Sequence, residues 1–148
     1  MTIMIEAGSP GRKNLILFLY VCAFVILDAA LYFLRDGASF IHGAAEILVV
    51  FLFPFGAFVY GYATGDRVRS FLAGTLSYAS FLAAAFVAGI QPTLENPNYP
   101  ALFAGYHLTL LIVAGLIGCF ASNKQTPFRI LALVLAVLWI MIFFQGIE

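Results

Sequence analysis

The sequence predicts an all-α integral membrane protein: a single domain over residues 1–148, folded as a bundle of five transmembrane helices with a cytoplasmic N-terminus and an external C-terminus. Hydrophobic residues make up 64% of the chain and charged residues only 9%, whereas soluble domains are about 45–50% apolar and about 25% charged. Five apolar runs are each long enough to cross about 30 Å of hydrocarbon. The basic residues collect in connections that would share one side of a membrane.

The five runs cover residues 14–34, 43–62, 70–90, 101–121 and 128–147. Each must be helical, because hydrocarbon offers no hydrogen-bond partner to an unpaired backbone group. Gly65 and Asp66 suit a C-cap and an N-cap, so the second and third helices should form a tight hairpin. Thr126 and Pro127 suit the start of the last helix.

The orientation follows from the basic residues. Six of the seven fall on one side if there are five spans: Arg12, Lys13, Arg67, Arg69, Lys124 and Arg129. Only Arg35, before the predicted turn at Asp36 and Gly37, falls on the other side. Because positively charged connections remain in the cytoplasm, we expect a multi-pass protein of the plasma membrane with its N-terminus inside.

Small residues indicate which helix faces pack together, since helices in lipid associate through close backbone approach and hydrogen bonds. The stripes recur at spacings of three and four residues: Ala73, Ser77, Ser80, Ala84 and Ala88 in the third span, and Ala114 and Gly118, with His107, in the fourth. The second span aligns Glu46 with Val50, Phe53, Ala57 and Gly61. Pro54, near the middle of this span, predicts a kink or hinge, because proline removes one helical hydrogen bond.

Three ionisable residues lie inside the predicted spans, and at similar depths. Asp28 and His107 are each about 9 Å from the outer boundary at 1.5 Å per residue, and Glu46 is about 5 Å deep. His42 precedes Glu46 by one turn on the same face. These four residues are the candidate ion or ligand site, because a charged side chain in a membrane span usually faces an interior or a cavity.

Three functions fit this pattern. In the first, Asp28 and His107 pair with each other or with serines of the third span, and the protein is an accessory, assembly or structural subunit. The alternative is a proton- or cation-linked transporter or channel subunit that uses the outer-half Asp/Glu/His cluster. The second alternative is a metal-dependent, lipid-active membrane enzyme, in which carboxylates and imidazoles hold a divalent ion.

Composition and motifs limit the partners and the activities that this protein can have. The sequence has no HExxH motif and no recognisable serine or cysteine nucleophile motif, which argues against an enzyme. It identifies no cofactor and no particular metal. The basic residues form no patch large enough for nucleic acid. We therefore expect the lipid bilayer as the main partner, with a homo-oligomer or a larger membrane complex as the protein assembly.

Overall fold

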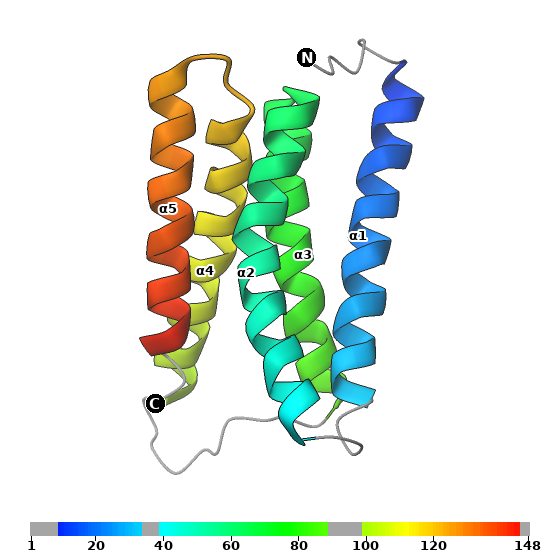
Figure 1. Cartoon of the computed structure of the whole chain (residues 1–148), viewed down its shortest axis with the longest axis vertical. Helices are drawn as coiled ribbons and strands as arrows, with labels where there is room; N and C mark the ends of the chain where they lie inside the picture. Colours follow the sequence, from blue (N-terminus) through cyan, green and yellow to red (C-terminus); the bar gives the residue numbers. More distant parts are fainter. Residues whose placement is uncertain (1–8, 34–38, 89–98, 146–148) are drawn as a thin grey trace.

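The computed structural model describes residues 9–33, 39–88 and 99–145. In these ranges the chain forms five helices (Figure 1): α1 (Pro10–Phe33), α2 (Ser39–Thr64), α3 (Arg67–Val87), α4 (Tyr99–Ala121) and α5 (Thr126–Gln145). All five are long and apolar enough to cross a membrane. The chain is therefore a multi-pass, all-helical integral membrane protein.

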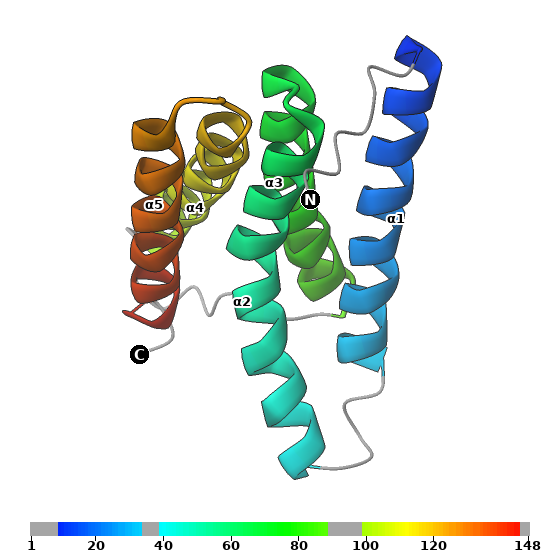
Figure 2. The same cartoon turned by 45° about the horizontal axis from the view of Figure 1, so that its top comes forward.

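The helices run alternately up and down, with α1 at one edge of the bundle and the α4–α5 pair at the other (Figures 1 and 2). Helix α3 packs against α1, α2 and α4, whereas α1 packs mainly on α3 and meets α2 through aromatic side chains such as Phe24 on Phe53. Helix α5 packs on α4 and α2. The start of α1, the α2–α3 turn and the α4–α5 turn lie at the same end of the bundle (Figure 1). We call it the basic end, because it carries the six basic residues named above.

The predicted helix ends at the α2–α3 turn are confirmed. Gly65 has a positive φ of 63°, a conformation that glycine adopts without steric cost. The Asp66 side chain accepts a hydrogen bond from the backbone N–H of Arg69, at 3.1 Å, as an N-cap does. Helix α5 begins at Thr126, as predicted.

Other helix ends differ from the prediction or fall outside the described residues. Helix α1 begins one turn earlier than expected, at Pro10, and the Ser9 carbonyl accepts a hydrogen bond of 2.9 Å from the Arg12 backbone N–H. Ser9 followed by Pro10 is a typical helix start that hydropathy alone overlooks. Arg35, the predicted turn at Asp36 and Gly37, and residues 89–98 lie outside the described residues.

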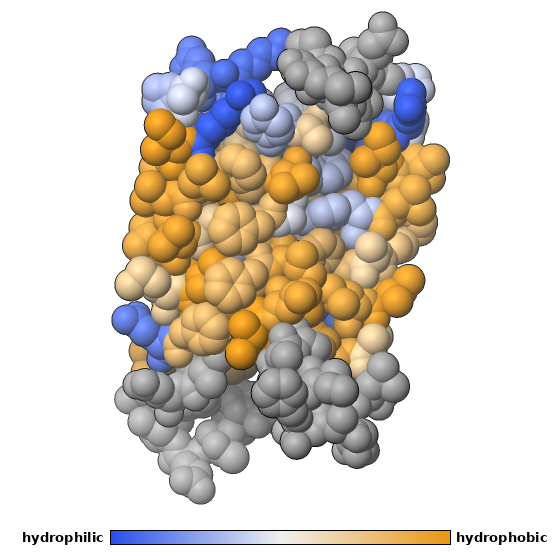
Figure 3. Space-filling view, in the orientation of Figure 1, coloured by the Kyte–Doolittle hydropathy of each residue, from blue (hydrophilic) through white to orange (hydrophobic). Residues whose placement is uncertain are grey.

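The core is aromatic and the lateral surface is apolar. The largest fully buried side chains are those of Trp139, Tyr78 and Phe53. Val50, Phe53, Ala57 and Gly61 are buried, which confirms the predicted stripe of α2 over the residues whose side chains are described. Many leucine, isoleucine, valine and phenylalanine side chains are exposed around the middle of the bundle, while hydrophilic residues gather at the basic end (Figure 3). This distribution suits hydrocarbon around the bundle and water at the basic end.

Candidate functional site

The carboxyl group of Asp28 lies at the contact between α1 and α3. The Asp28 side chain is 0% exposed, although it belongs to the helix at the edge of the bundle. The Ser80 hydroxyl lies 2.6 Å from Asp28 Oδ2 and donates to it. Ser80 Oγ is also 2.7 Å from the Ser77 carbonyl within α3. This is one of the pairings expected from the sequence, an acid of one span with a serine of another.

The imidazole of His107 lies on another side of α3. His107 Nδ1 is hydrogen bonded to the hydroxyl of Tyr78 at 2.7 Å, and Tyr78 is completely buried. The rings of Phe103 and Tyr106 flank the imidazole, with centroids 4.2 Å and 4.9 Å away. His107 therefore joins α4 to α3 in an aromatic environment.

Asp28 and His107 have similar depths but are held on different faces of α3. Their partners Ser80 and Tyr78 are two positions apart, which is a rotation of about 200° at 3.6 residues per turn. Within the described residues, no group of three or more His, Cys, Asp or Glu side chains lies close enough to hold a metal ion. His42 and Glu46 belong to the first turns of α2, and their side chains lie outside the described part.

Two polar atoms at the α1–α3 contact are buried and have no hydrogen-bond partner among the described residues: Asp28 Oδ1 and Tyr20 Oη. Tyr20 lies two turns before Asp28 on α1. Its hydroxyl lies close to Ser77 but forms no hydrogen bond with it. A Cβ added to Gly56 of α2 would be 2.8 Å from the Tyr20 hydroxyl. Tyr20 therefore lies where α1, α2 and α3 meet.

The small residues predicted to pack helices are placed as follows. Ala73, Ser77, Ala114 and Gly118 are buried, Ser80 and Ala84 are half-buried, and Ala88 is exposed at the C-cap of α3. A Cβ added to Gly118 would overlap the Ser70 carbonyl, and one added to Gly74 would overlap the Ala114 carbonyl. The backbones of α3 and α4 thus approach as closely as glycine permits. Helix α2 continues through Pro54 without interruption.

Further interhelical bonds join α4 to α5. The indole N–H of Trp139 donates to the Leu110 carbonyl at 2.9 Å, and Trp139 is completely buried. The Tyr106 hydroxyl donates to the Phe143 carbonyl, also at 2.9 Å. Trp139 is completely buried and Tyr106 and Tyr20 are half-buried, positions that were not predicted from the sequence. A signal was present for Trp139, since Ala132, Ala136, Trp139 and Phe143 form a stripe at spacings of four and three.

A charged cluster lies at the basic end, above the α1–α3 contact. The Arg69 guanidinium is paired with the Asp66 carboxylate and also donates to the Asn14 side chain of α1, at 2.9 Å. The Lys13 Nζ atom also lies near this pair, 3.9 Å from Asp66 Oδ2. Partial burial tends to raise the pKa of Asp66, but the hydrogen bonds and charge of Arg69 together with the charge of Lys13 outweigh it, so this pKa is lowered.

We expect Asp66→Ala to lower the free energy of unfolding by about 1 kcal/mol, the usual value of an N-cap. Because the folded state depresses the pKa of Asp66, its contribution is complete above the ordinary value of 3.8 and is lost as the pH falls below it. Thermal unfolding in detergent at neutral pH and at low pH measures this difference. Asp66→Asn, which retains a capping oxygen, is the control. An equal loss for both variants at every pH would contradict the capping role.

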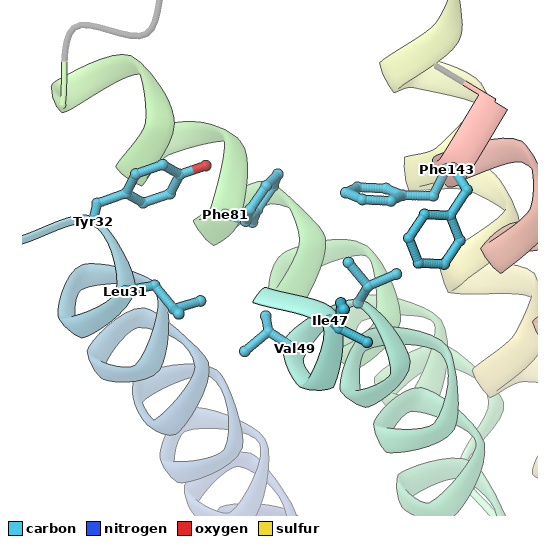
Figure 4. Close-up of a pocket in the computed structure, with 8 residues that line it drawn as sticks. Leu31, Tyr32, Ile47, Val49, Phe81 and Phe143 are labelled. Carbon is cyan, nitrogen blue, oxygen red and sulfur yellow. The ribbon is translucent and has the colours of Figure 1, made fainter. Parts of the chain in front are cut away.

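At the end of the bundle away from the basic end, four helices line a cavity of about 270 Å³. Leu31 and Tyr32 of α1, Ile47, Val49 and Val50 of α2, Phe81 of α3, and Phe143 and Phe144 of α5 surround it (Figure 4). Its lining is apolar apart from the Tyr32 hydroxyl, and a cavity of this kind holds apolar groups rather than ordered water. Asp28 precedes Leu31 by about one turn and is not part of the lining.

Comparison with known protein families, curated protein sequences and solved structures finds no match for this chain.

Proposed function

We propose that the protein is an accessory or assembly subunit: a five-helix membrane scaffold held together by polar bonds between its helices. One observation carries this proposal. Asp28 and His107, an acid and an imidazole deep within the described spans, each bond directly to α3. Hydrogen bonds of this kind stabilise membrane bundles by about 0.6 kcal/mol on average and at most about 1.7 kcal/mol. The exposed apolar faces of α1 and α5 suit lipid, a second copy or a larger complex.

We also propose that the N-terminus is cytoplasmic, the C-terminus is external and the membrane is the plasma membrane. The support is the collection of Arg12, Lys13, Arg67, Arg69, Lys124 and Arg129 at one end of the bundle. Cysteines placed at Arg67 and Lys124, both exposed, should react with an impermeant thiol reagent only from the cytoplasmic side. Reaction of the two positions from opposite sides would contradict five spans.

The scaffold proposal predicts a loss of stability without a change in transport. We expect Ser80→Ala and Tyr78→Phe each to lower the free energy of unfolding in detergent by about 0.6 kcal/mol, because each removes one interhelical bond. Asp28→Asn and His107→Gln should leave the ion permeability of reconstituted vesicles unchanged. Val25→Ala, at a lipid-exposed position of α1, is the control. If the protein carries an ion flux that disappears in Asp28→Asn and in His107→Gln while both variants remain folded, a purely structural role is ruled out.

A second candidate, a proton- or cation-linked transport subunit, is favoured by a different observation. Asp28 Oδ1 is buried without a hydrogen-bond partner among the described residues, and Tyr20 Oη on the same helix is in the same condition. A clamp with no other role would be expected to satisfy both oxygens of its carboxyl group, since a buried unpaired polar atom is destabilising. For this candidate, Asp28→Asn abolishes flux in vesicles while the protein remains folded.

A further inference from the structure

The polar groups between α1 and α3 form a continuous set, which we call the α1–α3 seam: Tyr20, Asp28, Ser77 and Ser80. Ser80 Oγ is 2.6 Å from Asp28 Oδ2 and 2.7 Å from the Ser77 carbonyl. The Ser77 hydroxyl donates to the Gly74 carbonyl at 2.9 Å, and Tyr20 Oη lies close to Ser77. The seam therefore extends from Asp28 toward the basic end over about two helical turns, or about 11 Å.

The seam contains two of the three buried side-chain polar atoms that lack a partner in the described residues, Asp28 Oδ1 and Tyr20 Oη. The third, Thr75 Oγ1, faces Gly115 on the α4 side of α3. Buried polar groups without protein partners are commonly satisfied by water, which needs two to four polar neighbours. The hydroxyls and carbonyls of the seam provide such neighbours at intervals of one turn.

A contact between two tyrosine rings extends the seam toward the basic end. The Tyr20 and Tyr60 rings are in contact, with centroids 5.0 Å apart. The Tyr60 carbonyl accepts a hydrogen bond of 2.8 Å from the hydroxyl of Thr64, the last residue of α2 at that end. Figure 3 shows pale and bluish residues between α1 and α2 that extend from the basic end into the apolar band. The described apolar cavity lies at the opposite end.

Helix α1 is also the helix best able to move aside and admit water. Its backbone lies close to α3 and farther from α2, which it meets through the rings of Tyr20 and Phe24. Its span has the smallest buried share of the five candidate spans. Regions with few buried apolar contacts open at low free energy.

We propose that the α1–α3 seam takes up water and forms a half-channel that gives protons a route between the basic end and Asp28. A hydrated proton arriving at Asp28 Oδ1 would leave its proton on the carboxylate and remain as water, and the reverse step would release it. This inference rests on the second candidate function, proton- or cation-linked transport. It specifies that the proton enters from the basic end of the bundle and that Tyr20, Ser77 and Ser80 line its route to Asp28.

The test measures the accessibility of cysteines placed along the seam in reconstituted full-length protein. Cys22 and Cys119, both free and half-buried, are first replaced by alanine. Ser77→Cys reports on the seam, and Leu76→Cys, at a position 39% exposed on the lipid side, is the matched control at the same depth. Arg67→Cys identifies the side from which a small impermeant thiol reagent is applied.

We expect Ser77→Cys to react at least about tenfold faster than Leu76→Cys, because the reactive thiolate forms where water reaches it. The reaction should require reagent on the side where Arg67→Cys reacts. Adding Tyr20→Phe should slow Ser77→Cys by about tenfold, since an apolar gap stays dry. Tyr62→Phe, which removes an exposed hydroxyl at the same end, should have no effect.

Ser80→Cys is a second reporter in case Ser77→Cys does not fold. The half-channel is wrong if both reporters react no faster than Leu76→Cys, or if they react only from the side opposite to Arg67→Cys. Proton flux is measured separately in the same vesicles. If the seam cysteines react fast but no proton flux is lost in Asp28→Asn, the water-filled seam is supported and the transport function is rejected. Flux abolished by Asp28→Asn without seam labelling would retain transport but reject this route.

Discussion

Gly118→Ala should lower the free energy of unfolding by about 1–3 kcal/mol, the range measured for added groups in tightly packed interiors. The added methyl group would overlap the Ser70 carbonyl of α3 and lie 3.4 Å from the Ala57 carbonyl of α2. Both obstacles are backbone atoms, so no side-chain rotation relieves the overlap and the helices must move apart. Unfolding by denaturant in mixed micelles, followed by circular dichroism, measures the change.

The same helix provides a matched control for this substitution. A Cβ added to Gly105 of α4 would meet nothing within 4 Å. Gly105→Ala should therefore leave the stability unchanged or raise it slightly, because alanine favours the helix over glycine. Equal effects of the two substitutions would show that helix propensity, and not the approach of α3 and α4, determines the result.

The second large effect is expected at the other side of α4. Trp139→Ala should lower the free energy of unfolding by about 3–5 kcal/mol, as truncation of large buried aromatic side chains does. The substitution leaves a cavity beside Phe53 and Tyr78, whose rings contact the indole, and it removes the donor to the Leu110 carbonyl. Thermal unfolding in detergent measures the loss.

Two further variants separate the contributions of Trp139. Trp139→Phe retains an aromatic ring but loses the N–H group and part of the ring volume. Its loss should therefore exceed the value of about 0.5–1.5 kcal/mol for the hydrogen bond alone and remain below the loss for Trp139→Ala. Leu138→Ala changes a lipid-exposed neighbour on α5 and should have little effect. A loss for Trp139→Ala no larger than for Leu138→Ala would contradict the core position of the indole.

The sequence was sufficient to predict the number of described helices, their hairpin turn and one buried stripe. Hydropathy determines where a chain crosses lipid, and the residues Gly65 and Asp66 have backbone requirements that show directly in the sequence. The stripe Val50, Phe53, Ala57 and Gly61 followed from helical periodicity alone. These features depend on local chain geometry, which the sequence encodes at short range.

The arrangement of the candidate site was less predictable. Spacing along a helix gives the depth of Asp28 and of His107, but it does not say which side of α3 each helix occupies. Equal depth suggested a shared cluster, whereas Ser80 and Tyr78 bind the two residues on different faces of α3. The positions of Tyr20 and Trp139 likewise depend on which helices are neighbours. Which helices are neighbours is a property of the tertiary structure, and it cannot be inferred from the residue spacing of a single sequence.

The pairing of Asp28 with Ser80 has a consequence for biogenesis. Helix α1 leaves the ribosome first, whereas Ser80 belongs to the third helix to be synthesised. During the interval, α1 must remain inserted with an acidic residue that lacks its serine partner, at a penalty of up to about 2.5–3.5 kcal/mol on translocon scales. The apolar side chains of α1 must offset this penalty alone. Translation slowed between α1 and α3 would therefore prolong the stage at which the nascent chain most needs a chaperone or the insertion machinery.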